Sequence, residues 1–488
     1  MARRVVTWCR GFGLLLVGLV GASLGCIGER PGEDGDRSRA LSTPVAGAAE
    51  GYVLFSPVLS YTTYLIDKAG RVVHTWHSEG PPGVSPYLLD NGHLLRCAQQ
   101  AGAPIHQGGA GGRVQELSWD GELLWDWAVS TENIQQHHDI EPLPNGNVLL
   151  IAGEHKSPQQ AIEAGRDPEL LGPEGLWPDC ILEVKPEPPN GGRIVWEWHL
   201  WDHLIQEYDP ERENYGKVSE HPELIDVNGP RPPELTDEVL QRLKAIGYLG
   251  AGARTGDQLA DFTHMNSVAY NAELDQIALS VLYFNEIWII DHSTTTEQAA
   301  GHAGGRCGKG GDLLYRWGHP AAYGRGGLND QRLFGQHDAR WIPREYPGAG
   351  NILVFNNGAK RLARGYSSIV EIEPPLDADG RYPIEATGRF GPAEPVWEYT
   401  AAEKESFFAD FISGAHRLPN GNTFICSGPD GRFFEVSPNG ETVWEYQNPY
   451  SGEAPNPSGD PPYCVFRATH LPPDHPALVG RDLVPVEP

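Results

Sequence analysis

Short apolar runs separated by turn residues recur along the chain from residue 51 onward. In each repeat one apolar run ends at an aspartate or glycine turn, and the next run ends on tryptophan. Runs of this length, bounded by Gly, Asn and Asp, are typical of β-strands. The tryptophans that close successive repeats are Trp76, Trp125 with Trp127, Trp196 with Trp198, Trp317, Trp397 and Trp444.

A loop, a second turn and another apolar strand follow these tryptophans. The second turn is of the Asn-Gly kind, as at Asn91-Gly92 and Asn145-Gly146. Four short strands per repeat predict a β-propeller blade, and the six tryptophan marks predict six blades. A pair of β-sandwiches, the alternative all-β fold, lacks such a repeated order. We therefore expect residues 51–488 to form an all-β, six-bladed β-propeller.

Two stretches interrupt the otherwise even spacing of the repeats. Residues 199–262 form the longer one, and their apolar positions have helical spacing between Glu234 and Ile246. Residues 155–178 form the second, which is rich in Pro and Glu. Long insertions in a tight repeat are usually lids or binding loops. We expect a partly helical insertion at 199–262 that overhangs a site on the propeller.

The N-terminal segment has the features of an export signal. Three arginines among the first ten residues precede an apolar run at 11–20 that is too short to span a membrane, and small residues follow. We interpret residues 1–25 as a signal peptide. Cys26 lies in a sequence that resembles a bacterial lipoprotein box, so its lipidation is expected to tether the protein to a membrane. Residues 26–50 are expected to be a flexible tether, and the protein a periplasmic or cell-surface lipoprotein.

Composition and charge narrow the class of partner. The 59 Gly, 42 Pro and 14 Trp fit many short strands joined by tight turns. A formal net charge of -28 argues against nucleic acid and against anionic membranes as partners. An anionic substrate would therefore need a locally positive pocket.

Five cysteines remain after the signal peptide and Cys26 are set aside. Export permits disulfides, but an odd number allows at most two bridges and one free thiol. No CxxC spacing is present, so a structural zinc site is not expected. The five are Cys97, Cys180, Cys307, Cys426 and Cys464.

Histidines recur near the turn that precedes an apolar strand. They are His138, His264, His337 and His416. A single histidine at such a place is more often a hydrogen-bonded turn residue than a catalytic one. Equivalent points of successive blades face the same end of a propeller channel, so four histidines in phase are expected to converge there.

An arginine adds positive charge to this set. Arg361 follows the strand after His337, in the stretch 354–361 that also contains Asn357. A half-buried guanidinium beside neutral imidazoles can grip an anionic group with fixed donors.

Three kinds of chemistry could use such a set of residues. The imidazoles could bind Zn, Cu or Fe, as in a metal-dependent hydrolase or lyase. One imidazole could act as a nucleophile while the others hold an anionic group. The propeller could also bind a ligand without chemistry. A nearby cationic arginine disfavours a metal ion, so transfer of an anionic group without metal or cofactor is the preferred hypothesis.

Residues 51–470 resemble the bacterial PAPS-independent arylsulfotransferase (aryl-sulfate sulfotransferase) family. The resemblance rests on six motifs that together span nearly the whole mature chain. They are His138-Asp139-Ile140, Thr263-His264-Met265-Asn266-Ser267, Leu314-Tyr315-Arg316-Trp317-Gly318, Phe334-Gly335-Gln336-His337-Asp338, Asn356-Asn357-Gly358-Ala359-Lys360-Arg361 and Gly414-Ala415-His416-Arg417-Leu418-Pro419-Asn420-Gly421-Asn422.

The resemblance implies a propeller that moves a sulfuryl group from a phenolic sulfate ester to a phenol, with no nucleotide donor. It implies ping-pong transfer through a sulfohistidine, with His416 as the nucleophile. By the same resemblance His264, His337 and Arg361 grip the sulfuryl oxygens or shuttle protons. The remaining matched residues are expected to bind substrate, and they are His138, Asn266 and Asn357.

Overall fold

A computed structural model describes residues 46–102, 105–229, 232, 235–359, 361, 364–452 and 463–486. Residues 37–488 form one compact unit. The expected signal peptide (1–25), Cys26 and most of the expected tether lie outside the described residues. Within the described part, no helix is long and apolar enough to cross a membrane.

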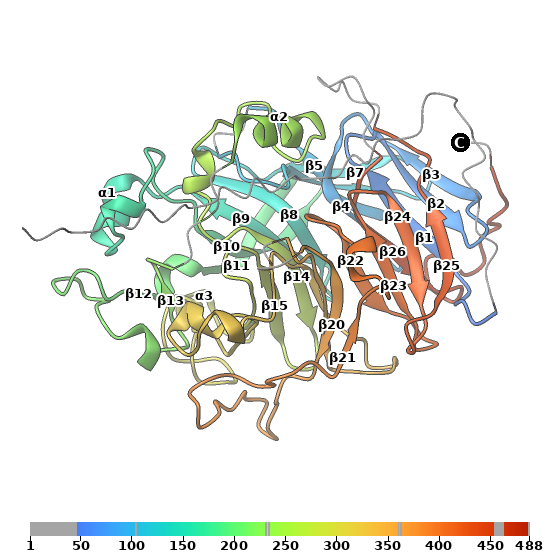
Figure 1. Cartoon of the computed structure of the whole chain (residues 1–488). Helices are drawn as coiled ribbons and strands as arrows, with labels where there is room; N and C mark the ends of the chain where they lie inside the picture. The colour runs from blue at the N-terminus through green and yellow to red at the C-terminus, as the bar shows by residue number, and fades with distance from the viewer. Residues whose placement is uncertain are drawn as a thin grey trace, which may run out of the picture. The chain divides into compact units, whose positions relative to one another are not determined.

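Six four-stranded sheets make up the body of the protein (Figure 1). The first contains β1 (Tyr52–Pro57), β2 (Thr62–Asp67), β3 (Val72–His77) and β26 (Val465–Leu471), and the second β4 (Pro82–Leu88), β5 (Leu94–Gln99), β6 (Gly112–Leu117) and β7 (Leu123–Ala128). The third contains β8 (Ile134–Pro142), β9 (Val148–Glu154), β10 (Asp179–Glu187) and β11 (Gly191–His199), and the fourth β14 (Met265–Asn271), β15 (Gln276–Val281), β16 (Glu286–Asp291) and β17 (Tyr315–Trp317). The fifth contains β18 (His337–Trp341), β19 (Ile352–Asn356), β20 (Ser368–Ile372) and β21 (Trp397–Tyr399), and the sixth β22 (Gly414–Arg417), β23 (Thr423–Ser427), β24 (Arg432–Val436) and β25 (Thr442–Gln447).

The six sheets are the blades of a β-propeller, as the sequence predicts. Each blade is antiparallel throughout. In five blades the strands follow chain order, whereas the first blade takes β26 as its inner strand. There Tyr52 of β1 pairs with Leu471 of β26, so the two ends of the propeller close the ring within one sheet.

The tryptophans that mark the repeats join each blade to the next. Trp76 in the first blade donates its indole N–H to the carbonyl oxygen of Ser118 in the second blade, at 3.1 Å. Trp444 in the sixth blade donates to Lys68 in the first, at 2.7 Å. Four further donations of the same kind complete the circle: Trp125 to Gly191, Trp198 to Gly311, Trp317 to Pro392 and Trp397 to Pro438. A buried indole N–H needs a partner, which gives the repeated tryptophan a structural reason.

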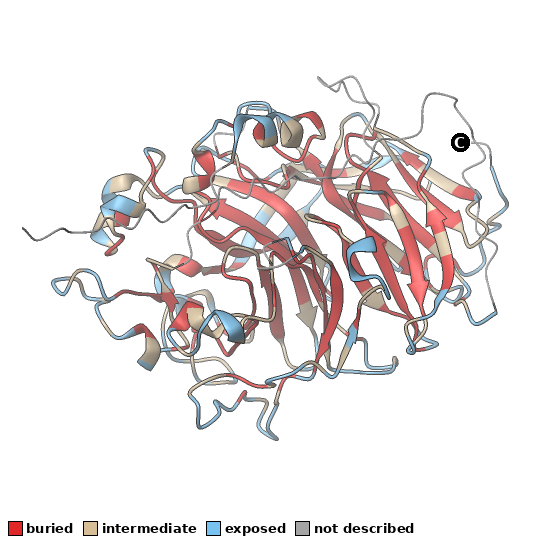
Figure 2. Ribbon diagram, viewed as in Figure 1, coloured by how far each residue is buried: buried red, intermediate tan, exposed pale blue. Residues whose placement is uncertain are grey.

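Apolar side chains fill the space between neighbouring blades. One cluster joins Leu95 and Val114 of the second blade to Leu150 and Leu182 of the third. Figure 2 shows burial along the strands and exposure mainly in the connecting loops. The sheets therefore bury both faces, which suits the nearly continuous apolar runs in the sequence.

The 199–262 insertion is partly helical, as predicted. Its helix α2 (Asp237–Ala245) begins after Thr236, whose side chain accepts a hydrogen bond from the backbone N–H of Val239. Capping by threonine and acidic residues in the first turn both stabilise a helix start. The insertion also contains the 3-10 helices η2 (Leu200–His203), η3 (Val218–Glu220) and η4 (Asp257–Leu259), and a short parallel pair, β12 (Leu204–Ile205) with β13 (Ile225–Asp226).

The other helices are short and lie in connections. The Pro- and Glu-rich insertion contains α1 (Pro158–Glu163) and η1 (Pro168–Leu170). The rest are α3 (Thr296–Ala299), η5 (Pro320–Tyr323), η6 (Leu328–Asp330) and η7 (Lys404–Ser406).

Two details refine the expectations from sequence. All five cysteines of the described chain are free thiols, so none of the two permitted bridges forms there. The end of the expected tether also contacts the propeller. Ala49 is buried, and its N–H donates to Oε1 of Glu435 at 2.7 Å.

Candidate functional site

Backbone irregularities occur at histidines within or at the start of three inner strands, β8, β14 and β18. His138 and His264 have positive φ values of 52° and 54°. The register of β8 shifts between Gln136 and Ile140, and that of β18 shifts after His337. Left-handed φ in such residues costs about 1–3 kcal/mol each and persists where a bulge re-aims a side chain. These histidines are therefore turned out of the regular strand pattern.

Tyr248, from the 199–262 insertion, joins two of these histidines. Its hydroxyl lies 2.8 Å from Nε2 of His138 and 2.9 Å from Nε2 of His264. The two imidazole rings meet edge to face, with centroids 4.7 Å apart. All three side chains are buried. The insertion thus contributes a residue to the histidine cluster, as its predicted overhang requires.

Carboxylates lie at both ends of this arrangement. On one side, Nδ1 of His138 is 2.7 Å from Nδ1 of His137, whose Nε2 is 2.9 Å from Oδ1 of Asp179. On the other side, Nδ1 of His264 is 2.5 Å from Oδ2 of Asp261. Six side chains therefore form one continuous hydrogen-bonded chain, which we call the relay.

The neutral groups of the relay supply fewer hydrogens than it has contacts. Its five contacts need five hydrogens, because each hydrogen bond uses one. Three neutral imidazoles and one phenol supply four between two ionised carboxylates. With four hydrogens one of the five contacts has no hydrogen, so the relay has room for one further proton.

The tautomer of His337 is fixed by Asn357. Nδ2 of Asn357 donates to the carbonyl oxygens of Ala409 and Ile412, both at 2.8 Å. Its Oδ1 must then face Nδ1 of His337, 2.8 Å away. An amide oxygen only accepts, so Nδ1 of neutral His337 carries the hydrogen and Nε2 carries a lone pair.

Nε2 of His337 is buried and has no hydrogen-bond partner among the described residues. Burial lowers the pKa of His337 to about 4, and the nearby His264 contributes to the shift. The ring of Phe466 contacts both His337 and His138. Nδ2 of Asn266 donates to the carbonyl oxygen of Gln336, just before β18 of the next blade, and its buried Oδ1 is likewise unpaired within the described chain. The cluster therefore presents unused polar atoms.

The aspartates that follow His138 and His337 bind a pair of arginines. Asp139 accepts from Nη2 of Arg467 at 2.8 Å, and Asp338 accepts from Nε of Arg340 at 2.6 Å. The hydroxyl of Tyr87 lies within 2.7 Å of Oδ1 of Asp139. Burial raises the pKa of Asp139 to about 6, opposed by the positive charge of Arg340. These residues form a buried ionic layer from the inner strands of four blades, which sequence reasoning did not identify.

His416 lies at a different level of the channel. Ala339 donates its N–H to Ser267, and Ala415 donates its N–H to Asp338, so the two alanines are equivalent in their blades. His337 precedes its alanine by two residues, whereas His416 follows its own by one. His416 therefore does not occupy the position in its blade that His337 occupies in the fifth blade. Its position corresponds to that of Arg340.

The contacts of His416 agree with this displacement. Its Nε2 accepts the backbone N–H of His470 at 3.0 Å, and its ring lies 5.1 Å from that of Phe424. Burial lowers its pKa to about 3, with a contribution from the charge of Arg340. Within the described part of the chain, no hydrogen bond or ring contact joins His416 to the other three histidines.

Arg361 is a half-buried cation held by aromatic rings. Its guanidinium lies over Tyr366 at 4.1 Å and over Phe334 at 4.9 Å, and Nη2 donates to Ser368 at 3.1 Å. Burial lowers its pKa. Among the described residues it forms no ion pair, and no hydrogen bond joins it to the histidines. Its charge remains available for an anion.

Of the four histidines that the sequence predicts to converge, the structure groups His138, His264 and His337, and their hydrogen-bond partners were not predicted. Tyr248 and Asp261 lie in an insertion without repeat periodicity, and His137 was hidden beside His138. The aspartate after each histidine was the available signal for the ionic layer.

Fold and site together define a class: a six-bladed propeller with buried imidazoles, joined to carboxylates, on its inner strands. The chain belongs to the arylsulfotransferase (ASST) family, whose model matches residues 54–449. No curated protein matches the chain.

Several solved structures match the chain at low identity. A protein of unknown function from Bacteroides caccae has 12% identity and a TM-score of 0.44, covering 87% of this chain and 99% of its own. Streptogramin B lyase has 11% identity and a TM-score of 0.38, covering 87% and 93%. Hydrazine synthase from Kuenenia stuttgartiensis has 12% identity and a TM-score of 0.35, covering 67% and 68%. Similarities at this level carry no inference about activity.

Proposed function

We propose that the protein transfers a sulfuryl group from a phenolic sulfate ester to a phenol, in two steps through a histidine. Family membership supports the reaction class. The observation that carries the proposal is the buried Nε2 of His337, which has no partner in the described parts of the chain and whose tautomer Asn357 fixes. A neutral imidazole with a free lone pair is a nucleophile.

In the first step Nε2 of His337 attacks the sulfur atom. The new N–S bond forms as the S–O bond to the aryl group breaks, and that electron pair leaves on the phenolate oxygen. A sulfuryl group in flight is similar to a transferring phosphoryl group, so charge accumulates on its equatorial oxygens. Arg361, which has no carboxylate partner among the described residues, is suited to stabilise that charge.

The relay supplies the proton that the leaving phenolate needs. A proton taken up by the relay can pass through Tyr248 between His138 and His264, and the carboxylates Asp179 and Asp261 hold the compensating charge. In the second step the same groups take the proton from the acceptor phenol, whose oxygen attacks the sulfohistidine. General acid–base catalysis of this kind contributes about 10²–10⁴-fold.

His416 is the alternative nucleophile, on the resemblance to the family. Its imidazole is neutral near pH 7, since burial lowers its pKa to about 3. Its Nε2 lone pair already accepts the N–H of His470, so attack from that atom must first break a hydrogen bond. The geometry therefore favours His337.

Incubation with 4-nitrophenyl sulfate, with and without phenol, tests the activity. Release of 4-nitrophenol only with phenol supports transfer, and release without it indicates hydrolysis instead. If no aryl sulfate releases its phenol, the result contradicts transfer and supports a propeller that binds a ligand without chemistry.

Single variants decide the nucleophile. We expect His337→Ala to lower kcat by at least about 10³-fold and to abolish labelling of the protein by ³⁵S-sulfate ester. His416→Gln is expected to retain both. Loss of labelling in His416→Gln with labelling kept in His337→Ala assigns the reaction to His416 and overturns the assignment to His337.

A further inference from the structure

A second cluster of histidine and carboxylate lies outside the channel, and the proposed transfer reaction does not use it. It forms where η2, in the 199–262 insertion, meets the segment after α3. Nδ1 of His203 lies 2.9 Å from Oδ1 of Asp312, and Nδ1 of His302 lies 2.7 Å from the same oxygen. The three ligand atoms all lie within 4.8 Å of one another.

The hydrogen-bonding pattern of His203 leaves a place for a cation in this cluster. Its Nε2 lies 2.8 Å from the carbonyl oxygen of Ala299, which can only accept, so Nε2 carries the hydrogen. Neutral His203 then directs a lone pair from Nδ1 toward the carboxylate of Asp312. Two acceptors at this distance repel each other unless a proton or a metal ion lies between them.

We propose that His203, His302 and Asp312 bind a divalent first-row transition metal ion, with Zn²⁺ as the probe. Two imidazoles and one carboxylate are a ligand set for Zn²⁺ or Fe²⁺ with coordination positions left open. A histidine ligand usually donates its other ring N–H to a carbonyl or carboxylate, as His203 does to Ala299.

Small movements make room for the ion. Ligands at about 2.0–2.1 Å in tetrahedral geometry are roughly 3.3 Å apart, so the present contacts need to open by about half an ångström. The side chain of His302 is 62% exposed and can move, whereas those of His203 and Asp312 are 0% and 9% exposed and hold their places. The buried pair forms a fixed base, and His302 closes onto the ion.

A cavity gives the ion a path and room for further ligands. It has a volume of about 380 Å³ and is lined by His302 together with Asp202 and Glu213. Two acidic side chains at its wall attract cations, as does the net charge of -28 on the whole chain. The open coordination positions on the side of His302 can take water or an anionic ligand from this cavity.

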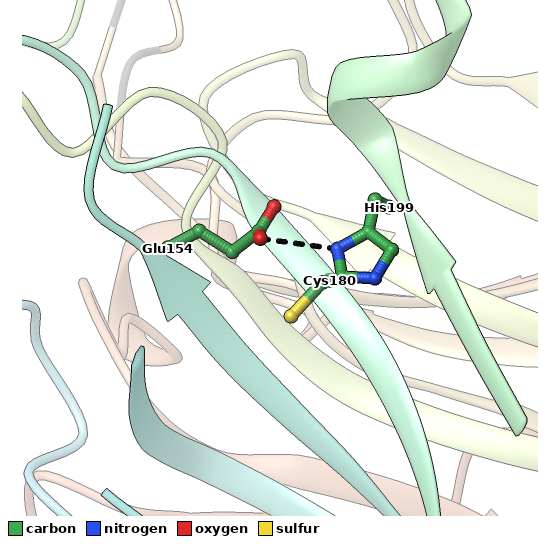
Figure 3. Close-up of side chains that lie close together, drawn as sticks. All are labelled: Glu154, Cys180 and His199. Atoms are coloured by element: carbon green, nitrogen blue, oxygen red, sulfur yellow. Dashed lines mark ion pairs between the residues drawn. The ribbon is translucent and has the colours of Figure 1, made fainter. Parts of the chain in front are cut away.

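A second group of potential ligands is less suitable. Glu154 and His199 face each other at the ends of β9 and β11, with Cys180 on β10 between them (Figure 3). Cys180 packs in an apolar cluster, and burial raises the pKa of its thiol well above the usual value. Because metals bind the thiolate and not the thiol, Cys180 is a poor ligand. Lys156 also lies 3.5 Å from Glu154 and competes with a cation. This group therefore serves as the comparison.

Calorimetric titration of the chelator-treated full-length protein with Zn²⁺ tests the proposal. We expect one ion per chain in the wild type and at least about tenfold weaker binding in His302→Ala and Asp312→Asn. His302 is exposed, so its variant keeps the fold, which far-ultraviolet circular dichroism checks. The matched controls are His221→Ala, which alters the same cavity wall, and Glu154→Gln, which alters the comparison group.

The possible outcomes show whether a proton or a metal ion lies between His203 and Asp312. Unchanged binding in both controls, with loss in His302→Ala, supports the site. Absence of Zn²⁺ and Co²⁺ binding by the wild type assigns the cation between His203 and Asp312 to a proton and overturns the proposal. Loss of binding in Glu154→Gln alone places the ion at the comparison group and overturns it as well. Because the readout is metal binding, the result does not depend on sulfuryl transfer.

Discussion

Nδ1 of His337 donates to Oδ1 of Asn357 at 2.8 Å, and no other orientation of the amide satisfies its neighbours. The two residues are 20 positions apart in sequence: His337 begins β18, and Asn357 directly follows β19 in the same blade. Through this contact Asn357 determines which nitrogen of His337 is available for chemistry. Asn357, which was expected to bind substrate, thus orients the imidazole of His337 instead.

Replacing Asn357 with Ala is expected to lower kcat more than it changes KM. The imidazole of His337 is then free to flip or to adopt the other tautomer, so only part of the protein has Nε2 ready to attack. We expect a loss in kcat of about 10–100-fold, similar to the loss of an orienting partner elsewhere. Steady-state kinetics with 4-nitrophenyl sulfate measures both constants. A rise in KM with kcat unchanged would instead make Asn357 a substrate contact.

Tyr248→Phe is expected to impair reactions that need a proton on the leaving group. The variant interrupts the relay between His138 and His264 while keeping the ring. With phenyl sulfate, whose phenolate is a poor leaving group, we expect a fall in kcat of about 10²-fold or more.

With 4-nitrophenyl sulfate, the same change is expected to have a much smaller effect, because 4-nitrophenolate leaves without protonation. The comparison needs a control outside the cluster, and Tyr270→Phe, whose hydroxyl donates to Asp275, provides one. Equal losses with both substrates would show that Tyr248 serves folding or binding rather than proton transfer.

The hydrogen bonds by which tryptophans join neighbouring blades predict that two similar substitutions differ in their effect on stability. Trp444→Phe leaves the carbonyl oxygen of Lys68 without its donor. Trp341→Phe removes an indole N–H that has no partner among the described residues. We expect Trp444→Phe to lower the free energy of unfolding by about 1–3 kcal/mol more than Trp341→Phe. Urea denaturation measures both, and equal losses would mean that packing alone explains the repeated tryptophan.

Buried His470 predicts a pH dependence of stability. Burial, with the charge of Lys68, lowers its pKa to about 3 in the folded state, whereas the unfolded value is about 6.5. The unfolded chain therefore binds the proton first as the pH falls. The stability that neutral His470 supports is complete above about pH 6.5 and is lost progressively toward pH 3.

His470→Gln removes this dependence and keeps a donor for the carbonyl of Glu50, to which Nε2 of His470 is now bonded. Between pH 6 and pH 4 the wild type is expected to lose stability relative to the variant, by up to about 1.4 kcal/mol per pH unit. Denaturation at several pH values measures the difference. A constant difference between the two proteins would contradict the lowered pKa.

The sequence predicted the blades well because their signal is repeated. Each of Trp76, Trp317 and Trp444 has the same structural task, so the motif recurs and the number of blades could be counted. The family resemblance extended over the same residues and was confirmed. Helix α2 was also predictable, since its apolar spacing and the cap at Thr236 are local features.

The site was less predictable because its geometry depends on register and on distant contacts. The turn after His416 is similar to the turn after His138, and this similarity placed His416 with the other histidines. The bulges in β8 and β18 shift the side chains that precede the turn, and no turn motif records that shift. Tyr248 is 110 residues from His138 in sequence, so nothing local connects them.

Because β26 completes the first blade, the order in which the chain is synthesised determines the order in which the blades can form. The partner of Tyr52 is Leu471, so the first blade stays incomplete until residue 471 has left the ribosome. Blades two to six can each pair from neighbouring sequence, while β1 keeps an open edge. A chain that stops before Val465 keeps that edge permanently, and an unpaired edge strand recruits strands of other molecules. Premature termination therefore yields a protein that assembles with its copies instead of with itself.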